Sequence, residues 1–186
     1  MGAGKTEALR AFARHGAEVI SSDEIVHRLL REDAEVKAAI VERLGQDVVD
    51  DTGEIDRARV GRRVFSDPEA LRWLERLLHP RVVASYLAWR ERLAARPNPP
   101  AVCATEVPLL YEVGGESRFD AVVTVTAPAP VRAARVGRDV RDRERRLLPE
   151  EEKAARADFT FVNDGSLADL DAFVSDVIAQ LTNARG

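Results

Sequence analysis

The sequence predicts an α/β fold in which helices cover both faces of a parallel sheet. Apolar runs of strand length alternate with helical patterns along the 186 residues, and they read AEVI, AVCATEV, FDAVVTVTA and FTFV. Strands that alternate with helices imply right-handed parallel connections and a three-layer arrangement. The second and third runs are apolar at most positions, which is typical of strands covered on both faces. The length suits one domain, so we predict a single domain over residues 1–186.

Charge and cysteine content narrow the class of protein. The sequence holds 28 basic and 32 acidic residues, and a net charge of -4 argues against a general nucleic-acid binder. The single cysteine, Cys103, cannot form an internal disulfide, and no apolar run reaches the length of a membrane span or a signal-peptide core. We therefore expect a cytoplasmic protein with no nucleic-acid or membrane partner. A monomer is the default expectation, because the sequence does not report oligomeric state.

The first elements follow from helical periodicity and capping residues. Apolar residues over 5–15 fall on one helical face, and Gly16 provides a left-handed stop. The strand at 17–20 is followed by Ser21, Ser22 and Asp23, whose side chains favour a helix cap before EIVHRLL. Asp23 is therefore expected near the carboxyl end of a strand, the edge at which open α/β sheets bind ligands.

A helical insertion is predicted over about 33–96. Helical patterns there are separated by turn signals such as DDTGEID, no segment resembles a strand, and RPNPP closes the region. Pro80 is expected in the first turn of a new helix. The strands at 101–107 and 119–127 follow, with PLLYEVGGESR between them too polar and glycine-rich for the core. The remainder predicts a helix from about Pro128, a strand at 159–162 and a last helix over 167–181.

The first residues match half of a phosphate-binding loop. In the pattern G-x-x-x-x-G-K-[ST], backbone N–H groups wrap around phosphates, the Lys reaches the outer phosphates and the hydroxyl reaches Mg²⁺. Gly4, Lys5 and Thr6 fit the end of this pattern, whereas its first glycine and the preceding strand would fall before Met1. We therefore expect a further apolar, central strand ahead of Met1. A chance match stays open, and Thr6 could equally cap the helix.

Four further stretches extend this match into a resemblance. SSDEIVHRLL, LLHPRV, VPLLYE and ARADFTFVNDGSLADL follow GAGKT in an order and spacing that resembles the dephospho-coenzyme A kinases over essentially the whole chain. The resemblance implies a three-layer P-loop NTPase fold with a helical acceptor-binding insertion and a lid at about 138–152. It implies transfer of the ATP γ-phosphoryl group, with Mg²⁺, to the ribose 3′-hydroxyl of dephospho-coenzyme A, the last step of coenzyme A biosynthesis.

The resemblance also assigns roles around ATP and the acceptor hydroxyl. Residues Gly2, Ala3, Gly4, Lys5 and Thr6 would hold the phosphates, with Thr6 also reaching Mg²⁺. Asp23 matches the second acid of the family's D-x-D and is the candidate base or orienting group for the acceptor hydroxyl. Ser21 replaces the first acid, which weakens any role for a second carboxylate in holding metal. The alternative is that Asp23 only caps a helix.

Other matched residues would contact the acceptor. His79, Leu110 and Glu112 belong to the matching stretches LLHPRV and VPLLYE, although a lone histidine often only holds a loop. Glu106 occupies a place where relatives often carry an aspartate. It would orient Mg²⁺ through water, or simply be buried at a strand end, and both interpretations remain open.

The arginine-rich stretch and the last turn complete the candidate site. Arg135 and Arg138 are the expected lid arginines, with Arg145 as a further candidate, although most of the arginine run would be a solvated helix face. Lys153 fits the family's pattern before ARAD. Asn163 and Gly165 match the turn beside the adenine, where a purely structural role is the alternative.

Two other functions stay open from the sequence. The chain could be a P-loop small-molecule kinase with another acceptor, or an inactive truncated protein that binds nucleotide without turnover. The joint presence of Lys5, Thr6 and Asp23 favours an active kinase.

Overall fold

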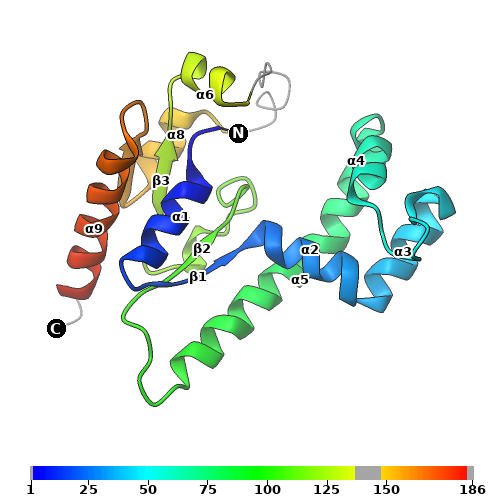
Figure 1. Cartoon of the computed structure of the whole chain (residues 1–186), viewed down its shortest axis with the longest axis horizontal. Coiled ribbons are helices and arrows are strands. Elements are labelled where there is room, and N and C mark those ends of the chain that lie inside the picture. The colour runs from blue at the N-terminus through cyan, green and yellow to red at the C-terminus, as the bar shows by residue number, and fades with distance from the viewer. Residues whose placement is uncertain (1, 137–147, 184–186) are drawn as a thin grey trace. The chain divides into compact units, whose positions relative to one another are not determined.

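The computed structural model of this chain describes residues 2–136 and 148–183 (Figure 1). It is an α/β protein with parallel strands and a mostly helical composition. The chain divides into two units, each of which is described by itself. We call residues 1–21 and 98–186 the sheet unit, and residues 22–97 the helical unit.

The sheet unit holds the four predicted strands as two parallel pairs. β1 (Glu18–Ser21) pairs with β2 (Cys103–Glu106), and β3 (Val123–Thr126) pairs with β4 (Phe159–Val162). Among the described residues, no strand ladder joins one pair to the other. The positions of the four strands agree with the sequence prediction, because each is a short apolar run flanked by turn-forming residues.

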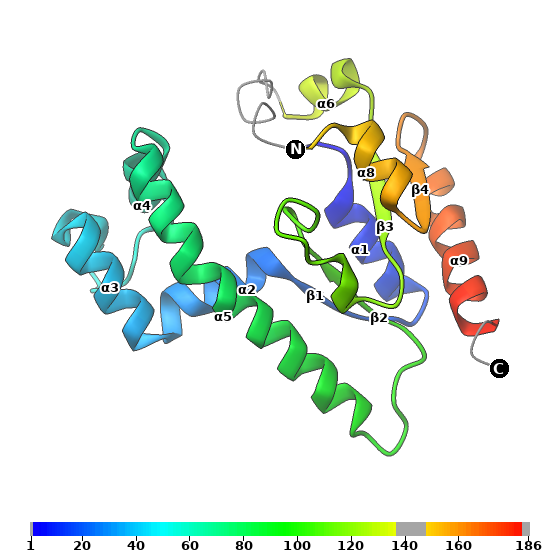
Figure 2. The same ribbon diagram turned by 180° about the vertical axis from the view of Figure 1, so that it is seen from behind.

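Helices pack on these strands to form the core of the sheet unit. They are α1 (Lys5–Arg14), α6 (Ala129–Val136), α8 (Glu150–Arg156) and α9 (Leu167–Asn183), with a short 3-10 turn, η2 (Glu116–Arg118). Helix α1 lies between α9 and the strands (Figure 2). Its apolar face joins that of α9 in a cluster that includes Ala11, Phe12, Leu170, Val174 and Val177.

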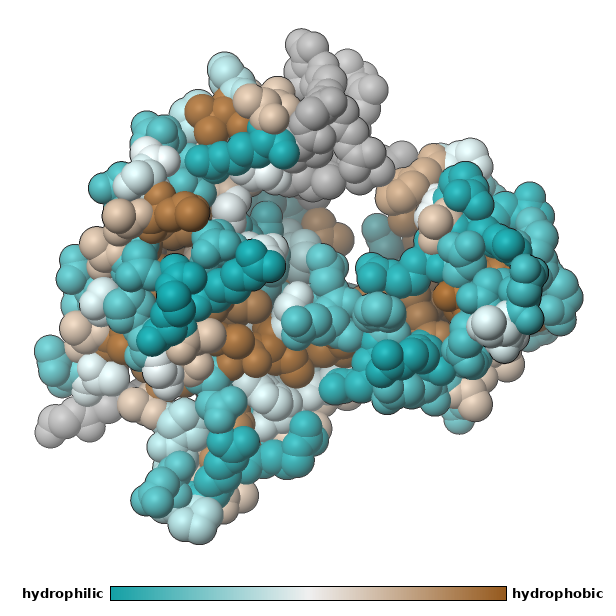
Figure 3. All heavy atoms as spheres, viewed as in Figure 1, coloured by the Kyte–Doolittle hydropathy of each residue, from teal (hydrophilic) through white to brown (hydrophobic). Residues whose placement is uncertain are grey.

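The helical unit contains α2 (Ser22–Glu32), α3 (Ala34–Leu44), η1 (Gln46–Val48), α4 (Arg57–Phe65) and α5 (Pro68–Ala94). Asp33, Asp56 and Asp67 each accept hydrogen bonds from backbone N–H groups at a helix start. Apart from one antiparallel bridge between Val49 and Ile55, the described part of this unit has no strand pairing, as predicted. The face of this unit that Figure 3 shows is mainly hydrophilic.

Two local predictions were wrong. Pro80 does not begin a helix, because α5 runs continuously through it. Leu78, Val82 and Tyr86 are buried along α5 on both sides of this proline, and Arg81 Nη1 donates to the carbonyl oxygen of the preceding turn at 3.0 Å. Packing thus maintains the helix despite the missing N–H donor.

Asp23 lies just after the end of β1, as expected, and within the first turn of α2, where a carboxylate favours the positive end of the helix. The second correction concerns the segment after β2. The segment PLLYEVGGESR does reach the interior, because Tyr111 is buried and its hydroxyl lies 3.5 Å from Thr124 Oγ1. Among the described helices, none is long and apolar enough to cross a bilayer.

Candidate functional site

The loop before α1 has a backbone shape that requires glycine. Gly2 and Gly4 have φ angles of 75° and 100°, in the left-handed region. A Cβ atom on Gly4 would lie 2.1 Å from Asn163 Nδ2, so there is no room for a side chain. The loop therefore approaches the turn after β4 more closely than any other residue at position 4 would allow.

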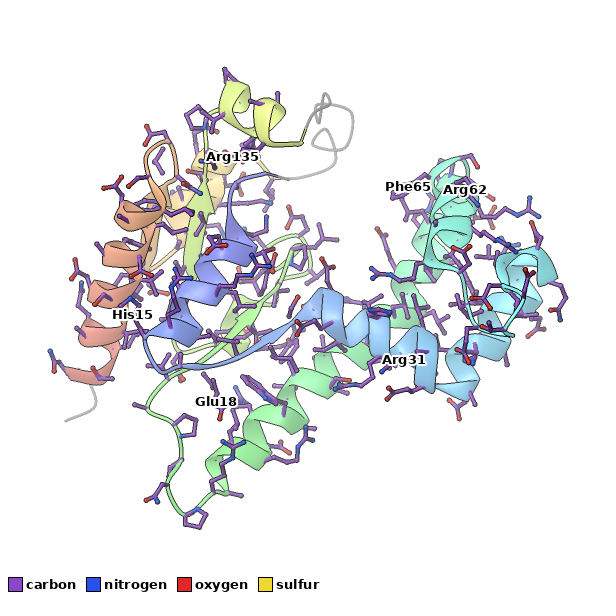
Figure 4. The ribbon with its side chains drawn as sticks, viewed as in Figure 1. His15, Glu18, Arg31, Arg62, Phe65 and Arg135 are labelled. Atoms are coloured by element: carbon purple, nitrogen blue, oxygen red, sulfur yellow. The ribbon has the colours of Figure 1, made fainter. Side chains whose placement is uncertain are left out.

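Asn163 links this loop to the turn after β4 by hydrogen bonds. Its side chain is 3% exposed, and Nδ2 donates to the carbonyl oxygen of Ala3 at 2.8 Å. Its Oδ1 accepts from Arg135 Nη2 at 3.3 Å, and Arg135 Nη1 donates to the carbonyl oxygen of Gly2 at 3.3 Å. Figure 4 shows Arg135 at the same end of the sheet unit as the start of α1, opposite His15. The fold thus brings the expected loop, turn and arginine residues together.

The first turn of α1 carries the expected phosphate and metal residues. Lys5 and Thr6 begin the helix, whose N-terminus offers backbone N–H groups and a positive dipole to an anion. Thr6 Oγ1 lies 3.5 Å from Glu106 Oε2, at the carboxyl end of β2. A hydroxyl beside a carboxylate is an oxygen donor set that suits Mg²⁺. In the described ranges, no cluster of three or more His, Cys, Asp or Glu could hold a metal alone.

A cavity of about 800 Å³ adjoins this loop within the sheet unit. The volume lies in the range of small-molecule sites, roughly 300–1,000 Å³. Charged side chains of both signs contribute to its wall, with Tyr111 and strand β3 among the other contributors. These charged residues are Lys5, Glu112, Arg132, Glu150, Glu151 and Lys153. The mixture can bind a ligand that carries both anionic phosphates and neutral polar groups.

Only one of the two carboxylate oxygens of Glu112 is hydrogen-bonded within the described protein. Its Oε1 accepts from Lys153 Nζ at 2.6 Å and from the backbone N–H of Leu148 at 3.2 Å. Its Oε2 is buried, and within the described part of the chain it has no hydrogen-bond partner. Leu110 also lines the cavity. Both predicted acceptor residues of the VPLLYE stretch therefore face the same space as Lys5.

Arg132 belongs to the cavity wall, although the sequence did not single it out as a site residue. Its exposed fraction is 7%, and it forms an ion pair with Glu150 in that wall. Helical spacing gave no signal of this burial, because Arg135, three residues later on α6, is exposed.

The remaining predicted residues are not joined to this cluster by the described contacts. Gly165 lies exposed in the turn before α9, where a Cβ would approach Asp169 Oδ2 at 2.6 Å. Asp23 is exposed in the first turn of α2 and His79 is half-buried in α5, both in the helical unit. Arg138, Arg145 and most of the expected lid at 138–152 lie outside the described residues.

Sequence comparisons agree in one description. A family model described as dephospho-CoA kinase matches residues 1–169. A dephospho-CoA kinase of Mesorhizobium japonicum is 38% identical over 196 residues, covering 100% of this chain and 95% of the relative. A second, from Anaeromyxobacter dehalogenans, is 36% identical over 190 residues and covers 98% of this chain and 89% of the relative.

Solved structures give the same result for the fold. A dephospho-CoA kinase structure from Campylobacter jejuni matches with a TM-score of 0.73 at 26% identity, covering 100% of this chain and 95% of that one. A crystal structure of a Thermus thermophilus protein matches with a TM-score of 0.74 at 35% identity, covering 98% and 94%. These structures share the α/β arrangement over nearly their full length.

Proposed function

The chain belongs to the dephospho-CoA kinase family, and from this membership we propose how its residues carry out the reaction. The enzyme is an ATP-dependent phosphotransferase that converts dephospho-coenzyme A to coenzyme A. The observation that carries the proposal is the glycine loop held by Asn163 at the start of α1, beside Lys5 and a cavity of nucleotide size.

ATP binds with its phosphates in the loop of residues 2–6. The backbone N–H groups and the N-terminus of α1 hold the phosphates, and the Lys5 ammonium balances charge on the outer ones. Arg135 adds a second cation at the loop. Mg²⁺, when bound, neutralises phosphate charge, and the Thr6 hydroxyl and Glu106 carboxylate would hold it. Phosphoryl transfer needs this kind of positioning and charge balance more than covalent assistance.

Four residues are proposed for the acceptor. Asp23 accepts the proton of the ribose 3′-hydroxyl or orients that hydroxyl toward the γ-phosphorus, and His79 contacts the acceptor. Glu112 Oε2 bonds a polar group of the acceptor, because Oε1 is already taken by Lys153 and Leu148. Leu110 provides apolar contact in the same cavity.

The proposal also covers the detailed fold, the cellular compartment and the oligomeric state. The fold is a three-layer P-loop domain in which residues 33–96 serve as the acceptor-binding insertion. Composition supports a cytoplasmic setting, since the sequence has one cysteine, and the enzyme acts as a monomer.

Kinase assays on matched variants test these roles. ADP release coupled to dephospho-coenzyme A is expected in the wild type. Asp23→Asn should lower kcat by about 10²–10⁴-fold, the usual contribution of a general base. Glu24→Gln is the matched control, because Glu24 is also exposed in the first turn of α2. Equal rates for Asp23→Asn and wild type would refute the role of Asp23.

Acceptor scans separate the alternatives. Turnover with a different alcohol acceptor and none with dephospho-coenzyme A would favour another small-molecule kinase. Binding of ATP without any ADP release would favour an inactive nucleotide-binding protein. Lys5→Ala distinguishes binding from turnover, since it should weaken ATP binding and abolish ADP release.

A further inference from the structure

Helix α8 contacts the segment that follows β2 through two basic side chains. We call residues 107–116 the acceptor segment, because the two sheet-unit residues proposed for the acceptor belong to it. Lys153 Nζ donates to Glu112 Oε1 at 2.6 Å, and Arg156 forms an ion pair with Glu116. The two basic residues lie three positions apart on α8 and therefore share one face of the helix. That face of α8 thus bonds the acceptor segment at two carboxylates.

Two glycines close a tight turn within the acceptor segment. Gly114 has a φ angle of 61°, in the left-handed region, and the N–H of Gly115 donates to the carbonyl oxygen of Leu110 at 2.8 Å. A Cβ atom on Gly115 would lie 3.2 Å from the same oxygen, which is closer than an ordinary contact. The turn therefore brings Tyr111 and Glu116, which lie on either side of the glycines, to the same helix.

The side chain of Tyr111 is contacted at its ring and at its hydroxyl. Tyr111 is 7% exposed, and the guanidinium carbon of Arg156 lies 4.7 Å from the centroid of its ring. Its hydroxyl lies 3.5 Å from Thr124 Oγ1 on β3, and that Oγ1 donates to the carbonyl oxygen of Lys153 at 3.5 Å. Helix α8 also packs beside β3 (Figure 2). Because Tyr111 directly precedes Glu112 in the chain, fixing its side chain restricts the backbone that carries Glu112.

The guanidinium group of Arg156 makes two contacts at once. A planar guanidinium can stack on an aromatic ring while its N–H groups pair with a carboxylate, whereas an ammonium is a compact point charge. A cation–π contact corresponds to a factor of about 2–30 in an equilibrium constant. Arg156 lies outside the wall of the cavity, as the described residues define it. Its effect on a ligand must therefore pass through the acceptor segment.

We propose that Arg156 is a positioning residue for the acceptor. Its stacking on Tyr111 and its ion pair with Glu116 keep the acceptor segment against α8, so that Glu112 Oε2 faces the acceptor. The inference rests on the proposed role of Glu112 in binding the acceptor. Lys153 contributes less to this positioning, because Glu112 Oε1 also accepts from a backbone N–H group at 3.2 Å.

Steady-state kinetics of the full chain test this inference. Arg156→Lys keeps the positive charge but cannot stack and pair at the same time. The KM for dephospho-coenzyme A should rise by about tenfold, within the range of a cation–π contact, while the KM for ATP stays nearly constant. Amide hydrogen exchange over residues 109–113 should be faster in the unliganded variant. Arg10→Lys is the matched control, because Arg10 also forms an exposed ion pair, and both of its KM values should equal those of the wild type.

Variants at Tyr111 test whether Arg156 acts through the aromatic ring. Tyr111→Phe keeps the ring under the guanidinium, so its KM for dephospho-coenzyme A should stay near that of the wild type. Tyr111→Leu removes the ring and should raise this KM. Adding Arg156→Lys to Tyr111→Leu should then change the KM little, whereas the effects of independent residues would multiply.

The outcomes separate this inference from the role proposed for Glu112. The inference is overturned if Arg156→Lys leaves both KM values unchanged, raises both equally, or multiplies with Tyr111→Leu. If Glu112→Gln raised the KM for dephospho-coenzyme A and Arg156→Lys did not, this inference alone would fail. If Glu112→Gln left that KM unchanged, the proposed role of Glu112 would be wrong, and the positioning role of Arg156 with it.

Discussion

At the scale of single residues, Asn163 shows how a side chain acts on phosphates through the backbone. Its amide bonds Ala3 and Arg135, so it positions the loop and touches no reacting atom in the proposed mechanism. Asn163→Ala should raise the KM for ATP by about tenfold while the KM for dephospho-coenzyme A stays nearly constant. The lost partner of the Ala3 carbonyl should also cost about 1–3 kcal/mol of stability.

The control for this prediction is the neighbouring exposed residue. Asp164→Ala changes the same turn without removing the buried amide, so its KM for ATP should match the wild type. If Asn163→Ala raised both KM values equally, the asparagine would have a general structural role and no specific effect on the loop.

Glu112 and Lys153 form an ion pair whose two members we expect to differ in function. Their side chains are 15% and 17% exposed, so the pair is only partly screened by solvent. Glu112→Gln should raise the KM for dephospho-coenzyme A about tenfold, because the carboxylate also bonds the acceptor in our proposal. Lys153→Met should mainly lower stability, by about 1–3 kcal/mol, by removing one charged partner.

Steady-state kinetics and urea unfolding of both single variants and the double variant measure this difference. Interaction between the two changes should appear in stability and much less in the acceptor KM. A Lys153→Met enzyme with the same acceptor KM defect as Glu112→Gln would show that the pair acts as one unit. Glu152→Gln, an exposed position on α8, is the surface control.

At the scale of elements, helix α5 depends on an aspartate cap that responds to pH. The backbone N–H groups of Ala70 and Glu69 bond the Asp67 carboxylate and lower its pKa below the ordinary value near 3.8. Because the pKa of Asp67 is lower in the folded state, its carboxylate contributes fully to the free energy of unfolding above the unfolded-state pKa. This contribution is lost as the pH falls through the folded-state pKa. Asp67→Asn keeps an acceptor but removes this titration.

Thermal unfolding of the wild type and Asp67→Asn tests the cap. It is measured between about pH 3 and pH 7, a range that includes the ordinary pKa of an aspartate carboxyl group. The wild type should unfold at the higher temperature near neutral pH, and the difference should shrink toward the acid end. A difference that grew on acidification would contradict the sign of the pKa shift. Asp51→Asn, an exposed turn residue, should give a curve parallel to the wild type.

The same scale shows which parts of the structure the sequence could predict. The four strands and helices α1 and α9 were predictable because their periodicity and flanking turn residues are local signals. The continuity of α5 through Pro80 was not, because tertiary packing overrides a local preference for a helix boundary. Local patterns set the elements, and packing sets where they end.

The sequence could nominate residues for the candidate site but could not give the contacts among them. The loop glycines, Lys5 and Asn163 follow from motif and resemblance, but the bond between Asn163 and Ala3 joins positions 160 apart in sequence. The burial of Arg132 depends on its contact with Glu150, which no periodicity encodes. Side-chain contacts between distant segments require the fold before they can be assigned.

At the scale of the whole molecule, the residues proposed for ATP belong to one unit, whereas two of those proposed for the acceptor belong to the other. Residues 2–6, Arg135 and Asn163 are in the sheet unit, as are Leu110 and Glu112, whereas Asp23 and His79 are in the helical unit. Only the acceptor is therefore expected to change amide exchange in the helical unit. Mg-ATP alone should therefore slow amide exchange in the loop and in the turn after β4. Dephospho-coenzyme A alone should slow exchange in α2 and around the middle of α5.

The shift in the thermal unfolding midpoint that each ligand causes gives this prediction a magnitude. A ligand at about one hundred times its Kd stabilises the state it binds by about 2.7 kcal/mol, which corresponds to roughly 5–10 °C for a chain of this size. Lys5→Ala should remove the shift caused by Mg-ATP and retain the one caused by dephospho-coenzyme A. His79→Ala should do the reverse, because the two residues belong to different units and to different ligands. Loss of both shifts in either variant would mean that the changed residue affects both ligands, and the separate roles proposed for Lys5 and His79 would be wrong.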